Sequence, residues 1–206
     1  MRHARFTLAA MLSLLGVLSV TPVFAHDPNA MPSGGSGVRT EMVMWIKDAE
    51  DKLIQLAEAT PDNKYAFRPS KEVRTTGEVF MHVSAANFGV PSFWGVKPPE
   101  GFNFATHEKS FTKKAEIVQS LKDSFAYMEK AFMDLPDADL DKPAEFFGMK
   151  TTVRGGYMLL LSHAHEHLGQ SIAYARMNGI VPPWTAKDLA EAKAKMEAEK
   201  KTTATK

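Results

Sequence analysis

The sequence predicts an all-α protein whose folded part is a four-helix bundle. Apolar residues recur at intervals of three and four in four separate segments, which is the spacing of one buried helix face. Each of these segments is followed by proline or by a glycine-containing turn. No segment sustains the apolar–polar alternation that is typical of a strand, and no internal repeat is evident. Four amphipathic helices without strands favour a bundle.

The first 25 residues have the layout of a cleaved secretory signal peptide. Two arginines lie within the first five residues, an apolar run covers 6–20, and the small residue Ala25 ends the segment. A membrane anchor needs about 20 apolar residues, and Thr21-Pro22 interrupts the run before that length. We therefore expect cleavage before His26, export to the periplasm or secretion, and no membrane span in the mature chain.

Charge and the absence of cysteine exclude several classes of function. Without residues 1–25 the chain keeps 23 basic and 24 acidic side chains, a net charge of about −1 with neutral histidines. A near-neutral chain without a basic stripe argues against nucleic acid as a partner. The sequence contains no cysteine, which excludes disulfides, thiolate metal sites and a cysteine nucleophile.

The folded domain is expected at 38–184, between a flexible Gly- and Pro-rich leader at 26–37 and a charged, helical tail at 185–206. The first helix is predicted over 38–60, and Pro61 follows it. Its apolar residues at helical spacing are Met42, Trp45, Ile46, Ala49, Leu53, Leu56 and Ala57.

The second helix is predicted over 75–93, after a connector at 61–74, and a loop of ten to fifteen residues follows it. The third is predicted over 111–132, and 136–152 is expected to be a polar connector. The apolar stripe of the third helix consists of Ile117, Leu121, Phe125, Met128 and Phe132. The fourth is predicted over 153–177, where Asn178-Gly179 supplies a left-handed stop.

Helical geometry places His163 and His167 on one face of the fourth predicted helix. At 100° per residue the two imidazoles lie about 40° apart and one turn apart along the axis. Gln170 and Tyr174 share this stripe. His165 lies about 160–200° away, so we expect it to face solvent or a neighbouring element rather than to share a metal with the other two.

His82 lies on a stripe of mostly apolar or small residues in the second predicted helix, the side expected to face the core. Burying an imidazole without a partner costs a few kcal/mol. A metal shared with His163 and His167 would satisfy all three rings. Three protein nitrogens leave an open coordination position, which is the ligand count of a catalytic centre. The alternative is that these are core histidines held by hydrogen bonds alone.

Two further residues bear on the site. Glu78 lies one turn before His82 on the same stripe, where it is a candidate base or hydrogen-bond partner of that histidine. The alternative is an ordinary carboxylate near the start of the helix. His107 lies in a predicted loop, where we expect a solvated side chain.

Two segments carry a resemblance to a known family. The segment HAHEHLGQSIAYARMNGIVPPW has an H-x-x-x-H pair followed by Gly-Gln, Tyr-x-Arg and Asn-Gly-x-x-Pro-Pro, and KYAFRPSKEVRTTGEVFMHVSAANF holds a single histidine. Over about 38–184 the chain resembles the DinB-like superfamily of bacterial four-helix-bundle metalloenzymes. This resemblance implies a divalent metal on His82, His163 and His167, with zinc as the first expectation and nickel or iron as alternatives.

Characterised relatives in that superfamily include S-transferases and isomerases that use low-molecular-weight thiols. The expected export of this chain removes it from the cytosolic thiol pool, which argues against such a cosubstrate. Our first hypothesis is therefore a metal-dependent hydrolase or group transferase acting on a small substrate. The alternative is a non-catalytic periplasmic metal-binding or stress-related protein. A homodimer is compatible with both.

Overall fold

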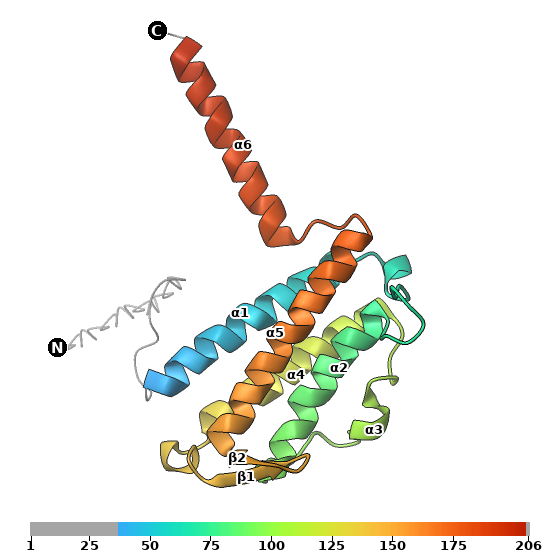
Figure 1. Cartoon of the computed structure of the whole chain (residues 1–206), viewed down its shortest axis with the longest axis vertical. Coiled ribbons are helices and arrows are strands. Elements are labelled where there is room, and N and C mark those ends of the chain that lie inside the picture. The colour runs from blue at the N-terminus through green and yellow to red at the C-terminus, as the bar shows by residue number, and fades with distance from the viewer. Residues whose placement is uncertain (1–36, 205–206) are drawn as a thin grey trace, which may run out of the picture. The chain divides into compact units, whose positions relative to one another are not determined.

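The computed structural model describes residues 37–204, and the predicted signal peptide and leader lie outside the described residues. Four long helices, α1 (Gly37–Ala59), α2 (Thr76–Gly89), α4 (Lys114–Asp134) and α5 (Val153–Met177), form the bundle that the sequence predicts. Figure 1 shows α5 running beside both α1 and α2. No helix within the described residues is both long enough and apolar enough to cross a membrane.

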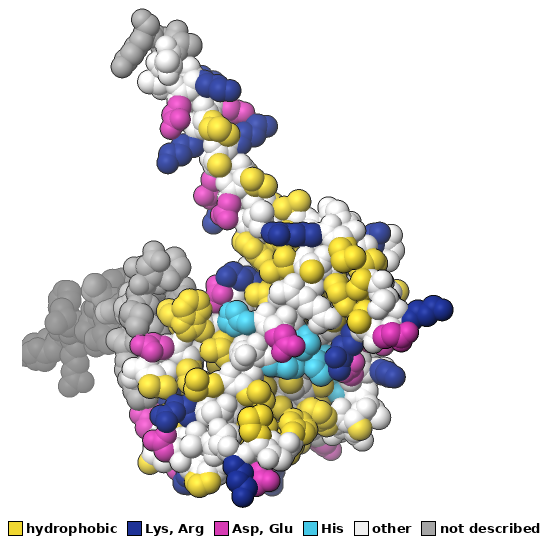
Figure 2. All heavy atoms as spheres, viewed as in Figure 1, with side chains coloured by type: hydrophobic (Ala, Val, Ile, Leu, Met, Phe, Trp, Pro, Cys, Tyr) yellow, Lys and Arg dark blue, Asp and Glu magenta, His cyan; other side chains and the backbone are white. Residues whose placement is uncertain are grey.

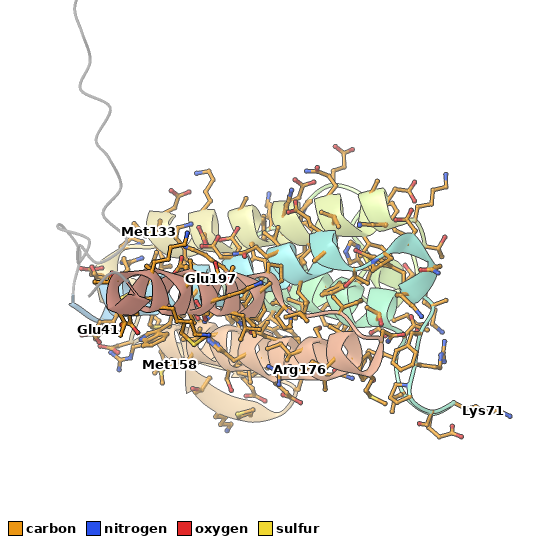
Figure 3. The ribbon with its side chains drawn as sticks, turned by 90° about the horizontal axis from the view of Figure 1, so that it is seen from above. Glu41, Lys71, Met133, Met158, Arg176 and Glu197 are labelled. Carbon is orange, nitrogen blue, oxygen red and sulfur yellow. The ribbon has the colours of Figure 1, made fainter. Side chains whose placement is uncertain are left out.

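The core lies between the four long helices, and Figure 3 shows their side chains filling the space between the ribbons. The largest fully buried side chains are Tyr157, Phe80, Phe125, Phe132, Phe146, Ile46, Leu53, Leu56, Met81, Ile117, Leu121 and Met128. The stripes predicted for the first and third helices are therefore buried with one exception. Trp45 belongs to the predicted stripe of α1 but is 51% exposed.

α2 is the most deeply buried of the four helices, and its N-terminus is capped. The Thr75 side chain accepts from the Glu78 backbone N–H, and the Glu78 side chain accepts from the Thr75 backbone N–H. The predicted helix over 75–93 is correct only as far as Gly89. Beyond it the chain continues as the 3-10 helix η2 (Val90–Trp94), because Pro91 has no N–H to extend the α-helical pattern.

The segment predicted as a polar connector between the third and fourth helices contains a β-hairpin, so that expectation is wrong. Strands β1 (Pro143–Phe146) and β2 (Met149–Thr152) pair antiparallel. The turn residues Phe147 and Gly148 both have positive φ, as a two-residue hairpin loop requires. Strands of four residues are too short to show a sustained alternation in sequence.

Two other boundaries differ from the prediction. A short helix α3 (Phe104–His107) occupies the predicted loop, and α4 begins at Lys114 rather than at 111. The predicted stop after α5 is correct, since Gly179 has φ +72. The helical tail is also confirmed as α6 (Pro183–Ala204): Trp184 packs against the core, and every described side chain beyond Thr185 is exposed.

A candidate metal centre between α2 and α5

Three histidines from two helices meet inside the bundle. His82 comes from α2, and His163 and His167 come from successive turns of α5. One ring nitrogen of each lies within 4.8 Å of the others, and the shortest distance is 3.0 Å between the Nε2 atoms of His82 and His163. The predicted convergence of these three side chains is confirmed. A group of this kind could hold one metal ion.

Local sequence explains why the two helices approach closely enough. Gly156 near the start of α5 faces Trp94 of η2, and a Cβ atom there would lie 2.4 Å from a ring atom of Trp94. The missing side chain therefore lets the end of the α2–η2 unit pack directly on α5. About two and three turns further along α5, His163 and His167 face α2 as the helical period requires.

Two of the three rings are held by hydrogen bonds from their outer nitrogens. His82 Nδ1 lies 2.9 Å from Glu108 Oε2, and His167 Nδ1 lies 2.8 Å from Gln170 Oε1. Gln170 in turn donates from Nε2 to the Tyr174 hydroxyl at 2.9 Å. An Nδ1–H that donates to oxygen leaves the Nε2 lone pair free, which is the tautomer that binds a metal through Nε2.

The third ring has no such hydrogen bond on its outer nitrogen. His163 Nδ1 is buried and has no hydrogen-bond partner within the described part of the chain. Burial, together with smaller effects of the charges of His167, His82 and Arg74, lowers the pKa of His163 to about 3. The ring is therefore neutral at physiological pH, as a metal ligand must be. The donor set fits a divalent ion that accepts imidazole nitrogen.

Glu108 and Arg74 set the charge around His82. Glu108 Oε1 accepts from Arg74 Nε at 2.7 Å. Partial burial raises the pKa of Glu108, but the hydrogen bonds and charges of Arg74 and His82 outweigh it, so the net shift is downward. Burial and the Arg74 charge lower the pKa of His82 against the opposing effect of Glu108. The site thus combines the neutral imidazole of His163 with an ionised carboxylate on the outer nitrogen of His82.

The carboxylate that contacts His82 is not the one that the sequence suggested. Glu78 caps α2 and lies 3.4 Å from Arg68, so the structure supports its alternative reading as a helix-end carboxylate. Glu108 was missed because it comes from the segment between α3 and α4, where no helical period constrains its direction. Gln170 was visible in the sequence, since it shares the stripe of His163 and His167.

The two remaining histidines of the domain lie elsewhere. His165 faces α1, with Nδ1 3.1 Å from the Leu161 carbonyl oxygen and Nε2 4.0 Å from Asp48 Oδ2. This agrees with the expectation that it would contact a neighbouring element. The expectation for His107 is wrong, because it is not a solvated loop residue. Its Nε2 lies 3.0 Å from Ser84 Oγ and 3.2 Å from Ser120 Oγ.

The histidine cluster is open to solvent on one side. The His82 side chain is 25% exposed. Figure 2 shows histidine side chains reaching the surface, with basic and acidic side chains beside them. A cavity of about 430 Å³ borders Glu108. Its lining includes Tyr65, Lys109 and Phe111, but none of the three clustered histidines.

Fold and site together define a helical-bundle protein with a candidate three-histidine metal centre. Residues 46–171 match the family model of the DinB superfamily, and the chain belongs to that family. This finding confirms the family expected from the two sequence segments.

Two solved structures share the fold. A DinB-like protein from Bacillus cereus ATCC 10987 is 21% identical, with a TM-score of 0.60 over 71% of this chain and 94% of that one. A DinB-like protein from Bacillus subtilis is 20% identical, with a TM-score of 0.53 over 68% of this chain and 93% of that one. No curated protein matches the sequence.

Proposed function

We propose that this protein is an exported metalloprotein that binds one divalent ion, zinc in the first instance, through His82, His163 and His167. The observation that carries the proposal is the convergence of one nitrogen from each ring within 4.8 Å. The outer hydrogen bonds to Glu108 and Gln170 support it, because metal-binding histidines commonly donate their second N–H to an oxygen.

We further propose that the centre catalyses hydrolysis or group transfer on a small substrate. Three protein ligands leave coordination positions open, and a divalent ion there supplies Lewis acidity and lowers the pKa of coordinated water. Glu108 is engaged by both His82 and Arg74, so its role is to hold a ligand rather than to act as a free base.

The alternative is a non-catalytic metal-binding protein in the same compartment. One observation favours it: the 430 Å³ cavity beside Glu108 is not lined by the histidines themselves. A substrate in that cavity would contact the outer side of the site rather than the ligand nitrogens.

The deciding experiment is elemental analysis of the protein purified from its exported compartment without metal-affinity columns. We expect about one equivalent of a divalent metal per chain. Intact-mass measurement of the same material tests processing, with the mature chain expected to begin at His26. Metal-free protein that cannot be loaded with zinc, nickel, iron or cobalt would contradict the proposal. Retention of residues 1–25 would instead indicate a membrane-tethered protein.

A further inference from the structure

The segment that precedes α4 is anchored to a buried polar seam between α2 and α4. Ser84 of α2 is fully buried, and its hydroxyl donates to the Ser120 carbonyl oxygen at 3.1 Å. The two serine hydroxyls lie 2.8 Å apart. His107, the last residue of α3, places its Nε2 within 3.2 Å of both hydroxyls. The imidazole thus joins a buried hydrogen-bond network that already links α2 to α4.

The next residue along the chain contacts the candidate metal centre. Glu108 bridges His82 Nδ1 at 2.9 Å and Arg74 Nε at 2.7 Å. His82 and Ser84 lie about 200° apart around α2, so the consecutive side chains of His107 and Glu108 contact two different sides of the same helix. The contact of His107 therefore limits where the Glu108 carboxylate can lie.

The beginning of the segment is anchored by aromatic packing. Phe104 covers Gly89 at the end of α2, where a Cβ atom would lie 2.0 Å from the Phe104 ring. The ring centroid of Phe102 lies 5.7 Å from that of Phe88 and 5.1 Å from that of His107. Any side chain at position 89 would displace Phe104, so the close approach requires glycine.

We propose that residues 102–108, here called the strap, are the positioning element of the metal centre. The strap is attached to α2 at Gly89, at Ser84 and at His82, and its last two residues have different roles. His107 fixes the position of the strap through its contacts with the Ser84 and Ser120 hydroxyls. Glu108 orients His82 so that Nε2 faces His163 and His167. Both are positioning residues, since neither belongs to the histidine group that would bind the metal. This inference rests on the proposed metal site.

A carboxylate anchored in this way holds a metal ligand better than one on a free loop. A glutamate side chain loses more than about 1 kcal/mol of rotamer entropy when it is immobilised. Because His107 and Arg74 already fix the Glu108 side chain in the metal-free protein, metal binding does not have to compensate for this loss of entropy. Loss of a carboxylate partner of a metal-binding histidine typically lowers metal affinity 10- to 100-fold.

The test measures cobalt(II) affinity by chelator competition for single and double variants of the whole mature chain. We expect Glu108→Gln to weaken binding roughly 10- to 100-fold, and His107→Ala to weaken it several-fold although it is not a ligand. Because the two act in series, the double variant should bind almost as well as Glu108→Gln alone. His107→Ala combined with Gln170→Ala should give additive losses, since Gln170 holds a different histidine.

Further variants separate positioning from general stability. His107→Gln keeps a polar group for the seam and should recover part of the affinity, and Ser120→Ala should give a smaller loss than His107→Ala. Lys113→Ala, at an exposed position five residues after the strap, is the control and should bind like the wild type. In the metal-free protein, 15N spectra should show His82 with its proton on Nδ1, and this signature should weaken in His107→Ala.

The outcomes distinguish the two proposals. If the wild-type protein binds no cobalt or zinc, the metal site fails and the strap inference fails with it. If the wild type binds metal but His107→Ala binds equally well, or if its loss simply adds to that of Glu108→Gln, only the strap inference is overturned. If His107→Ala does not fold, His107→Gln and Ser120→Ala decide by the same comparison.

Discussion

His82 and His163 are separated by 81 residues in the chain, yet their Nε2 atoms lie 3.0 Å apart. Without a metal, an Nε2–H of His163 can donate to the Nε2 lone pair of His82, because the His82 Nδ1–H is directed to Glu108. His167 adds a third ring whose centroid is 4.8 Å from that of His82 and 4.4 Å from that of His163. Three imidazole nitrogens from two helices that converge in this way are well suited to a metal site.

Removal of single histidines should separate ligands from neighbours. We expect His163→Ala and His167→Ala to lose most of the bound metal, because each removes one of three ligands. His165→Ala should keep the wild-type stoichiometry, since its ring faces α1. Elemental analysis of variants purified in parallel measures this. Equal loss from all three variants would mean that α5 is irregular around these residues.

The metal-free protein should lose stability in acid through His163. Its pKa is about 3 in the folded state against 6.5 for an unperturbed histidine, so between these values the unfolded chain binds more protons than the native one. The free energy of unfolding therefore falls as pH falls below 6.5, by at most about 1.4 kcal/mol per pH unit. Above pH 6.5 both states are neutral, and this contribution is constant.

Urea unfolding at pH 7, 5 and 4 tests this expectation. Other groups titrate in the same range, so the comparison is with His163→Gln, which cannot take up the proton. The difference in unfolding free energy between variant and wild type should shift in favour of the variant as the pH falls. An unchanged difference between pH 7 and pH 4 would contradict the low pKa of His163.

The sequence predicts a side chain's direction only where helical periodicity fixes it. His163, His167 and Gln170 lie on one long helix, so the helical period alone places them on one face. His82 could be added because its stripe faces the core. Glu108 could not be predicted, since a side chain between α3 and α4 has no period to give its direction. The hairpin around Phe147 was missed for a similar reason: its strands are four residues long.

Glu50 should make the protein less stable as the pH rises from 4.5 to about 8. Burial and the neighbouring Glu129 raise its pKa to about 8 against the lowering effect of Lys47. Between pH 4.5 and 8 the native state keeps a proton that the unfolded state releases, so unfolding free energy falls as pH rises. Glu50→Gln removes this loss. Its stability relative to the wild type should therefore increase from pH 5 to pH 8.5 in denaturant titrations, and a constant difference would refute the assignment.

Arg39 should be among the most sensitive positions for stability. This arginine is 5% exposed and donates to the backbone carbonyl oxygens of Phe132 and Leu135 at the end of α4, and it pairs with Asp137. Arg39→Met would leave these acceptors without their donor, at a cost of about 2–4 kcal/mol. Arg154→Met is the control, because its pair with Asp141 is exposed and worth less than about 1 kcal/mol. Similar losses in thermal melts of both variants would contradict the role of Arg39.

Any catalytic activity should require the metal and should not require a low-molecular-weight thiol. Neutral imidazole ligands leave the full charge of the ion to act on coordinated water, so activity should rise with pH as that water ionises. The proposed export would remove the chain from cytosolic thiols. The measurement is a screen of metal-loaded and metal-free protein against ester, amide and thiol-transfer substrates, including anionic ones, with and without added thiol. We expect turnover of a hydrolytic substrate by the loaded protein only, reduced in His167→Ala and retained in His165→Ala.

Turnover that appears only with thiol would restore the S-transferase interpretation. Tight metal binding without turnover of any substrate class would favour the non-catalytic alternative.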